Sequence, residues 1–150
     1  MANQYPQPEV YTTTHPFAAS GTALGSTDSQ TIYTNVAHNE QVLIYGVMVN
    51  FYEDAANGNG VGGVITLSGG ANEDARFAIS ITAGANTVPT NSFDAQFIHR
   101  KTDKMFTFAC PVLVNHRDVL QVTLERTSST AVSKNMYAKV TLIAEIQKKE

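Results

Sequence analysis

The stretch from Gln41 to Glu53, QVLIYGVMVNFYE, is the most hydrophobic run in the chain and constrains the fold more than any other segment. Successive side chains of a β-strand point to opposite faces, and this run is apolar in both registers. The first register holds Val42, Ile44, Gly46 and Met48, and the second holds Leu43, Tyr45, Val47, Val49 and Phe51. We therefore predict the central strand of an all-β domain, covered on both faces.

The polar residues of the chain are mostly uncharged, which favours sheets and turns over a helical bundle. Charged residues make up 15% of the 150 residues, against about 25% in typical globular proteins. A chain of this length is expected to form one domain. The net charge of −3 without a basic block argues against a nucleic-acid partner. Since neither a signal-peptide pattern nor a membrane-length apolar run is present, we expect a soluble protein without a membrane partner.

Residues 1–29 differ from the rest of the chain because they hold three of the five prolines and few charges. Proline favours extended or polyproline geometry and cannot donate to a strand ladder. A disordered tail is one interpretation of this segment. The other is an extended arm that lies on a neighbouring subunit, anchored by Tyr5, Pro6, Pro8, Val10, Tyr11 and Phe17.

From residue 30 onward a β pattern continues to the end, so we predict an arm over 1–29 and a sandwich domain over 30–150. The eight predicted strands cover 30–37, 41–53, 64–69, 76–83, 93–100, 105–114, 118–127 and 136–146. Eight antiparallel strands in two sheets indicate a jelly-roll-like β-sandwich. An immunoglobulin-like sandwich is the alternative, although its Cys–Trp–Cys core is missing.

Two residues of the 105–114 run have individual predictions. Pro111 costs a ladder bond, so we expect a bulge, an edge position or a strand break there. Cys110 is the single cysteine, and we interpret it as a small buried core residue, as free cysteines usually are.

No arrangement of side chains in the sequence indicates catalysis or metal binding. The four histidines lack metal-ligand spacing, and the Gly/Asn-rich loop 54–63 lacks the residue order of a calcium loop. The sequence also contains no nucleophile elbow and no phosphate-binding loop. We therefore predict a protein that is not an enzyme, with no catalytic residue, cofactor or metal ligand.

The organisation of the chain, with MANQYPQPEVYTTTHPF as an arm and a threonine-rich sandwich over 30–147, resembles the capsid decoration, or cement, proteins of tailed bacteriophages. The resemblance implies a non-catalytic virion protein that is made in the host cytoplasm and binds the capsid exterior. Its implied partners are the major capsid protein and further copies of itself, as a dimer or trimer. The alternative is a receptor- or glycan-binding module of a virion fibre or tail that uses loops 54–63, 84–92 and 128–135.

The second apolar register of the opening strand bears on assembly. If a neighbouring subunit covers it, its residues mark a subunit contact; if the same chain covers it, they belong to the core, which is the usual cause of such runs. The residues concerned are Leu43, Tyr45, Val47 and Val49.

Overall fold

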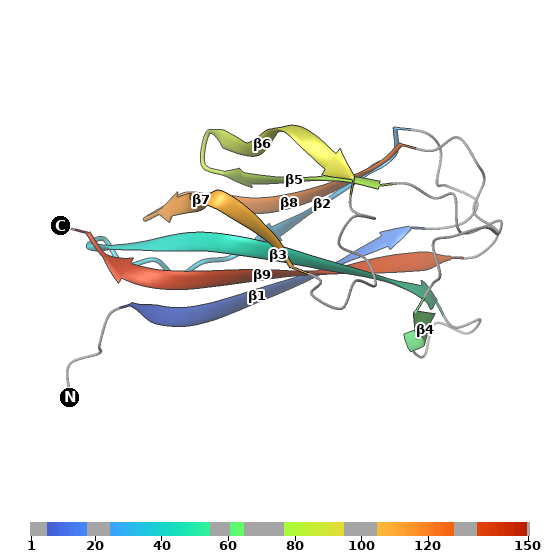
Figure 1. Ribbon diagram of the computed structural model, residues 1–150, viewed down its shortest axis with the longest axis horizontal. Helices are drawn as coiled ribbons and strands as arrows, with labels where there is room; N and C mark the ends of the chain where they lie inside the picture. The colour runs from blue at the N-terminus through green and yellow to red at the C-terminus, as the bar shows by residue number, and fades with distance from the viewer. Residues whose placement is uncertain are drawn as a thin grey trace.

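The computed structural model describes residues 6–17, 25–54, 61–64, 77–94, 105–127 and 135–149. These residues form two antiparallel sheets packed as a sandwich (Figure 1), which confirms the predicted all-β class. The strands are β1 (Gln7–Phe17), β2 (Thr27–Ile32), β3 (Glu40–Asp54), β4 (Val61–Val64), β5 (Phe77–Ala83), β6 (Asn86–Asp94), β7 (Phe106–Asn115), β8 (Leu120–Arg126) and β9 (Met136–Lys148).

The strands pair as a set of nested hairpins. Sheet A has the order β1-β9-β3-β4, with β7 also paired to β3, and sheet B has the order β2-β8-β5-β6. The outermost pair along the chain is β1–β9, followed inward by β2–β8, β3–β7 and β5–β6, all antiparallel. Strands distant in sequence are therefore neighbours in both sheets.

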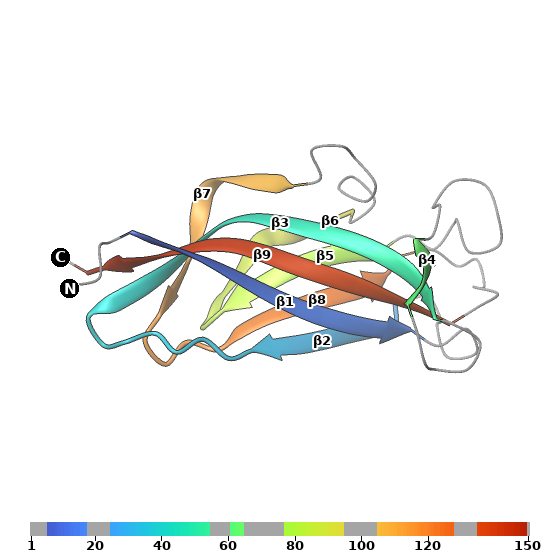
Figure 2. The same ribbon diagram turned by 90° about the horizontal axis from the view of Figure 1, so that it is seen from below.

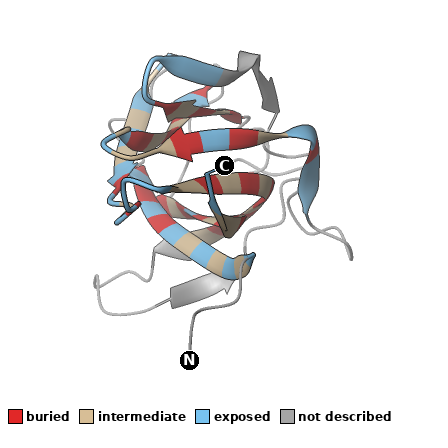
Figure 3. Ribbon diagram, turned by 90° about the vertical axis from the view of Figure 1, so that its left-hand side faces the viewer, coloured by how far each residue is buried: buried red, intermediate tan, exposed pale blue. Residues whose placement is uncertain are grey.

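The core lies between the two sheets and is filled by the inward side chains of alternating strands. Along β8, Leu120, Val122 and Leu124 are buried, and β5 buries Phe77, Ile79 and Ile81 in the same way. On β9 the inward residues Ala138, Val140, Leu142 and Ala144 are buried, while Ile146 is partly buried. Buried and exposed bands alternate along the strands in Figure 3.

The N-terminal segment differs from the predicted arm, because residues Gln7–Phe17 form an edge strand of sheet A. Strand β1 pairs with β9 along its whole length, from Gln7 opposite Ile146 to Phe17 opposite Met136. An edge strand bonds to one neighbour only, so half of its N–H groups are not needed for pairing and prolines are tolerated. Strand β2 then begins at Thr27, so the predicted boundary between residues 29 and 30 falls inside a strand.

Strand β6 occupies most of the segment 84–92, which we predicted to be a loop. It follows β5 through the two-residue turn Gly84–Ala85, and Gly84 has a φ of +61° that glycine adopts without strain. Residues 89–92 of β6 face only Ser80 of β5, because the register shifts there. Proline is tolerated at such an irregular edge position. The segment was predicted to be a loop because its sequence is polar.

Strand β7 contains the irregularity predicted at Pro111. Four residues, from Phe108 to Pro111, stand opposite Tyr45 alone, and Figure 2 shows β7 bending sharply away from β3 at this point. Cys110 lies in this expanded segment and is exposed, so the predicted burial of the thiol was wrong. The bend takes the side chain out of the alternation that would have placed it in the core.

The remaining strand predictions hold only in part. The strand predicted over 30–37 ends at Ile32. Most of the predicted strands 64–69 and 93–100, and of the loops 54–63 and 128–135, lies outside the described residues.

Candidate functional site

The side chains of sheet A that point away from the core form a broad surface, which we call outer face A. Its composition follows from the register of β1, β9 and β3, because directly paired residues share a face. From one end to the other, the cross-strand rows are Pro8–Glu145–Leu43, Val10–Ile143–Gly46, Thr12–Thr141–Met48, Thr14–Lys139–Asn50 and Pro16–Tyr137–Tyr52.

A β-bulge at Tyr45 determines which residues of β3 reach this face. Ile44 pairs with Ala144 and Gly46 with Ile143, so Tyr45 is an extra residue without a partner on β9. The bulge shifts the side-chain alternation by one position. The residues pointing inward are therefore Val42 and Ile44 before the bulge and Val47, Val49 and Phe51 after it, all at most 1% exposed.

The bulge divides the four residues predicted as a possible subunit contact. Val47 and Val49 are 0% exposed and belong to the core of this chain, so they cannot contact a partner in this fold. Leu43 and Tyr45 are half-buried on outer face A. The long apolar run thus consists of one inward face that changes register.

Outer face A exposes several large apolar side chains. Val10 is 56% exposed and Leu113, which pairs with Leu43, is 41% exposed. Met105, 42% exposed, lies over Gly46, since a Cβ on that glycine would come 2.5 Å from the Met105 sulfur. Large contiguous patches of exposed apolar side chains often mark interaction sites.

Charges are scarce on this face. Among its described residues only Lys139 and Glu145 are charged. The Glu145 carboxylate accepts hydrogen bonds from the Tyr45 hydroxyl, at 3.3 Å, and from the Gln147 side-chain amide. Desolvation and this nearby carboxylate raise the pKa of Tyr45. A surface depleted in charge and containing tyrosine has the composition of an interface core.

The outward side chains of sheet B, which we call outer face B, are of a different kind. They include Ser29 and Thr31 of β2, Thr123 of β8, and Ser80 and Thr82 of β5. Some of these hydroxyls bond to one another across strands, with Ser29 and Thr123 at 2.8 Å and Thr82 and Thr87 at 3.1 Å. No described strand residue of face B is a large exposed hydrophobic, although Tyr33, directly after β2, and Val119, directly before β8, are 91% and 57% exposed.

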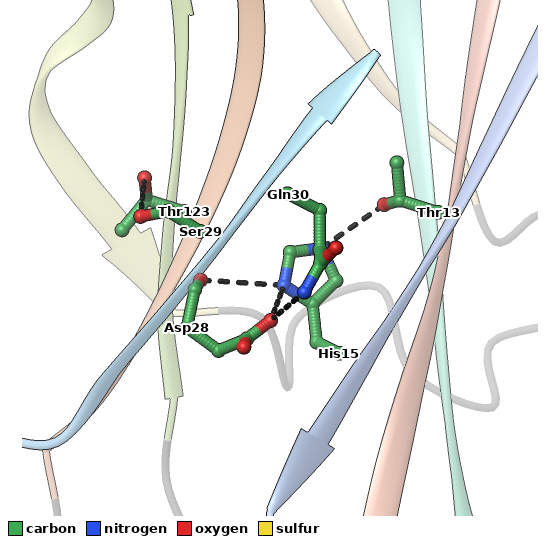
Figure 4. Close-up of polar contacts among 6 residues, drawn as sticks. All are labelled: Thr13, His15, Asp28, Ser29, Gln30 and Thr123. Atoms are coloured by element: carbon green, nitrogen blue, oxygen red, sulfur yellow. Dashed lines mark hydrogen bonds and ion pairs between the residues drawn. The ribbon is translucent and has the colours of Figure 1, made fainter.

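A buried polar cluster, the histidine clasp, connects β1 of sheet A with β2 of sheet B (Figure 4). His15 is 0% exposed and its Nδ1 lies 2.7 Å from Oδ2 of Asp28 and 3.3 Å from the Asp28 carbonyl oxygen. Its Nε2 lies 3.0 Å from the hydroxyl of Thr13. Gln30 donates to the same Asp28 oxygen at 2.9 Å, so both ring nitrogens and the carboxylate have partners.

The clasp holds a neutral imidazole. Burial lowers the pKa of His15 below its usual value. This effect is larger than that of the charge and hydrogen bonds of Asp28, which raise the pKa. The neutral tautomer that satisfies the partners carries its proton on Nδ1 and donates it to Asp28, while the Thr13 hydroxyl donates to Nε2.

The order hydroxyl, imidazole, carboxylate also occurs in nucleophilic relays. Here, however, Thr13 is only 9% exposed and His15 is fully buried. A substrate could not approach the hydroxyl through the packed sheets, so the arrangement favours a structural role for the clasp.

The residues predicted to anchor an arm are dispersed by the fold. Pro8 and Val10 lie on outer face A, whereas Tyr11 packs against the core and Phe17 is buried, with its ring centroid 4.7 Å from that of Phe77. Pro6 is exposed before β1, and Tyr5 lies outside the described residues.

Comparison of the chain with protein-family models, curated proteins and solved structures finds no significant match. Within the described ranges, no helix has the length and hydrophobicity needed to cross a membrane. The same residues contain no group of three or more histidine, cysteine or acidic side chains that could hold a metal ion. The two outer faces are therefore the candidate functional surfaces of the described residues.

Proposed function

We propose that this chain is a non-enzymatic structural protein of a virion that binds and stabilises an assembled phage capsid through outer face A. The observation that carries the proposal is the contrast in surface chemistry across one rigid sandwich. The strands of face A expose Val10 and Leu113, while the described strand residues of face B are mostly hydroxyl-bearing and include no large exposed hydrophobic. Exposed apolar side chains that gather on one face are typical of an interaction site.

The order of the strands supports a jelly-roll fold for this role. The pairs β1–β9, β2–β8, β3–β7 and β5–β6 are nested and divided between two sheets, as in a long hairpin rolled into a sandwich. Jelly rolls occur in viral capsid and lectin domains. Fold alone does not establish function, so this support is secondary to the surface.

The physical requirements of a cement protein match these features. Such a protein gains affinity when symmetry repeats a modest contact many times on one shell. A sheet face with few charges, held by paired strands, forms such a contact with little loss of conformational entropy. The partners are the major capsid protein and further copies of this chain, at the capsid exterior.

The contact surface in this proposal is a sheet face, since Gln7–Phe17 is not available as a free arm. Strand β1 contributes to the surface through Pro8 and Val10.

Binding to preformed capsid shells that lack the protein tests the proposal. The variant Ile143→Lys places a charge in the middle of face A, and Thr31→Lys places the same charge on face B. In a co-sedimentation assay we expect saturable binding of the native chain and of Thr31→Lys. We expect an at least ~10-fold loss of affinity for Ile143→Lys, because a buried unpaired charge opposes association.

Absence of saturable shell binding by the native chain would reject the proposal. Equal binding by Ile143→Lys and the native chain would reject the assignment of face A. Circular dichroism and urea unfolding of each variant separate lost binding from lost folding.

The alternative of a glycan-binding module of a fibre or tail has less support. It depends on three loops, and residues 86–92 of the second belong to strand β6. The others lie mostly outside the described residues, so no observation favours this function.

A further inference from the structure

We infer that outer face A is a self-complementary dimer interface, on which a second copy of this chain packs face to face with the two β9 strands antiparallel. The inference rests on the proposed function in treating face A as a contact surface. It goes further by naming the occupant and the orientation.

The two charged residues of face A carry the inference. Lys139 and Glu145 both point outward from β9 and are six positions apart, which corresponds to about 20 Å along a strand. Lys139 is exposed and forms no ion pair with another described residue. Glu145 accepts hydrogen bonds from the neutral side chains of Tyr45 and Gln147. Face A thus presents two opposite charges, neither in an ion pair with a described residue.

One symmetry operation pairs these charges. A two-fold axis that lies in the interface plane and crosses the strands at the level of Leu142 reverses the direction of β9. It places Lys139 opposite Glu145 of the second copy, and Glu145 opposite Lys139 of that copy, because Leu142 is midway between them. A two-fold axis along β9 would instead oppose Lys139 to Lys139. The charges therefore select the antiparallel arrangement, and such an interface is isologous.

The same axis brings compatible uncharged rows together. The row Val10–Ile143–Gly46 comes to lie over the row Thr12–Thr141–Met48 of the second copy. Met48 then faces Gly46 of the second copy, which is covered by the Met105 side chain of that copy, so the two methionines would come into contact. Methionine side chains are flexible enough to adapt to such a contact, and the threonine methyl groups meet Val10 and Ile143.

The size of the face fits a reversible dimer. Sheet A has three strands, β1, β9 and β3, along its whole length, while β7 and β4 pair only with the two ends of β3 and no described strand pairs with that edge of β3 from Met48 to Phe51. With ~4.8 Å between strands and ~3.3 Å per residue, ten residues of these three strands give a face of roughly 500 Å² per copy. The two copies would bury about 1,000 Å², the smallest area expected of a specific interface. Aligned sheets pack at about −30°, which accommodates their twist.

Sedimentation velocity of the full chain, between about 1 and 200 µM to bracket micromolar dissociation constants, tests the dimer with charge exchanges. We expect a concentration-dependent species with twice the 16.2 kDa chain mass. Lys139→Glu and Glu145→Lys each create two like-charge contacts in the homodimer. Each should therefore weaken dimerisation at least ~10-fold.

An equimolar mixture of the two single variants supplies the decisive measurement. In the mixed dimer every Glu faces a Lys again, so association should return to within about threefold of the native dissociation constant. The double variant Lys139→Glu/Glu145→Lys should dimerise as the native chain does. Thr31→Glu, which adds one negative charge to face B, should leave the dissociation constant unchanged.

A native chain that stays monomeric over the whole range would overturn the inference, as would single variants that fail to associate when mixed. Shell co-sedimentation of the same variants keeps the two proposals separate. Monomeric native protein that still binds shells through face A would reject the dimer and leave the proposed function standing. Charge-dependent dimers without any shell binding would reject the proposed function and leave the dimer standing.

Discussion

The two outer faces of the sandwich share one core yet differ in surface chemistry. Both sheets bury aliphatic and aromatic residues inward, but face A carries Val10, Ile143 and Leu43, whereas face B carries Ser29, Thr123 and Thr82. Folding restricts the residue types at inward positions, whereas the residue types at outward positions depend mainly on what these side chains contact. The difference between the faces therefore reports on the surroundings of the protein, which the fold alone cannot do.

The largest expected effect tests the boundary between face A and the core on β3. Val49→Asp should destabilise the protein by more than about 4 kcal/mol, because Val49 is 0% exposed and an unpaired carboxylate would be buried. Leu43→Asp, on the same strand but half-buried on face A, should cost about 1 kcal/mol or less. Urea unfolding measures both; similar losses at the two positions would contradict the bulge.

Next in size is the effect of breaking the clasp that joins the sheets. His15→Ala should lower the free energy of unfolding by about 2–4 kcal/mol, since it leaves a cavity and removes one of the two side-chain partners of Asp28. Thr14→Ala, on the adjacent outward position, should change stability by no more than about 0.5 kcal/mol. If the two variants unfold at the same urea concentration, His15 does not join the sheets.

A smaller effect comes from titrating the clasp. The pKa of His15 is lower in the folded protein than its unfolded value of about 6.5, so the unfolded chain binds more protons between these two pKa values. Stability from this group is complete above pH ~6.5 and falls as the pH drops toward the folded pKa. We expect the urea midpoint of the native chain to decline more steeply below pH 6.5 than that of His15→Gln. Parallel pH profiles would rule out His15 as the source.

The smallest expected effect is on face B. Thr123→Val removes the hydroxyl that bonds to Ser29 at 2.8 Å on an exposed surface. Because water can replace this partner, stability should change by at most about 0.5 kcal/mol, and binding to shells should not change. Reduced shell binding by this variant would show that face B contacts the shell and would contradict the proposed difference between the faces.

The sequence predicts those strands whose two faces differ clearly. Along β8 and β9, apolar and polar residues alternate, and the buried positions Val122 and Val140 follow directly. In β3 both registers are apolar, so the sequence pattern does not show which residues point toward the core. The bulge at Tyr45, which exchanges the two registers, could therefore not be found from it. The polar sequence of β6 shows no strand pattern, so this segment was predicted to be a loop. The prolines of β1 are the reason that its segment was predicted to be an extended arm.

The histidine clasp and the surroundings of the two charges on face A could be found only from the three-dimensional pairing. His15 and Asp28 are 13 positions apart, and nothing in either segment indicates that β1 of one sheet faces β2 of the other. Lys139 and Glu145 could be placed on one side of a strand from the sequence. Only the register with β1 and β3 shows that their surroundings are otherwise uncharged.

The nested order of the strands also affects how the protein can fold. Strand β9 lies between β1 and β3, so the middle of sheet A is filled by the last strand of the chain. Until that strand is synthesised, β1 and β3 have open edges, and β3 carries the most apolar sequence of the protein. Contacts this distant in sequence form slowly, and open apolar edges invite pairing between chains. Removal of residues 136–150 should therefore yield an aggregating chain instead of a smaller sandwich.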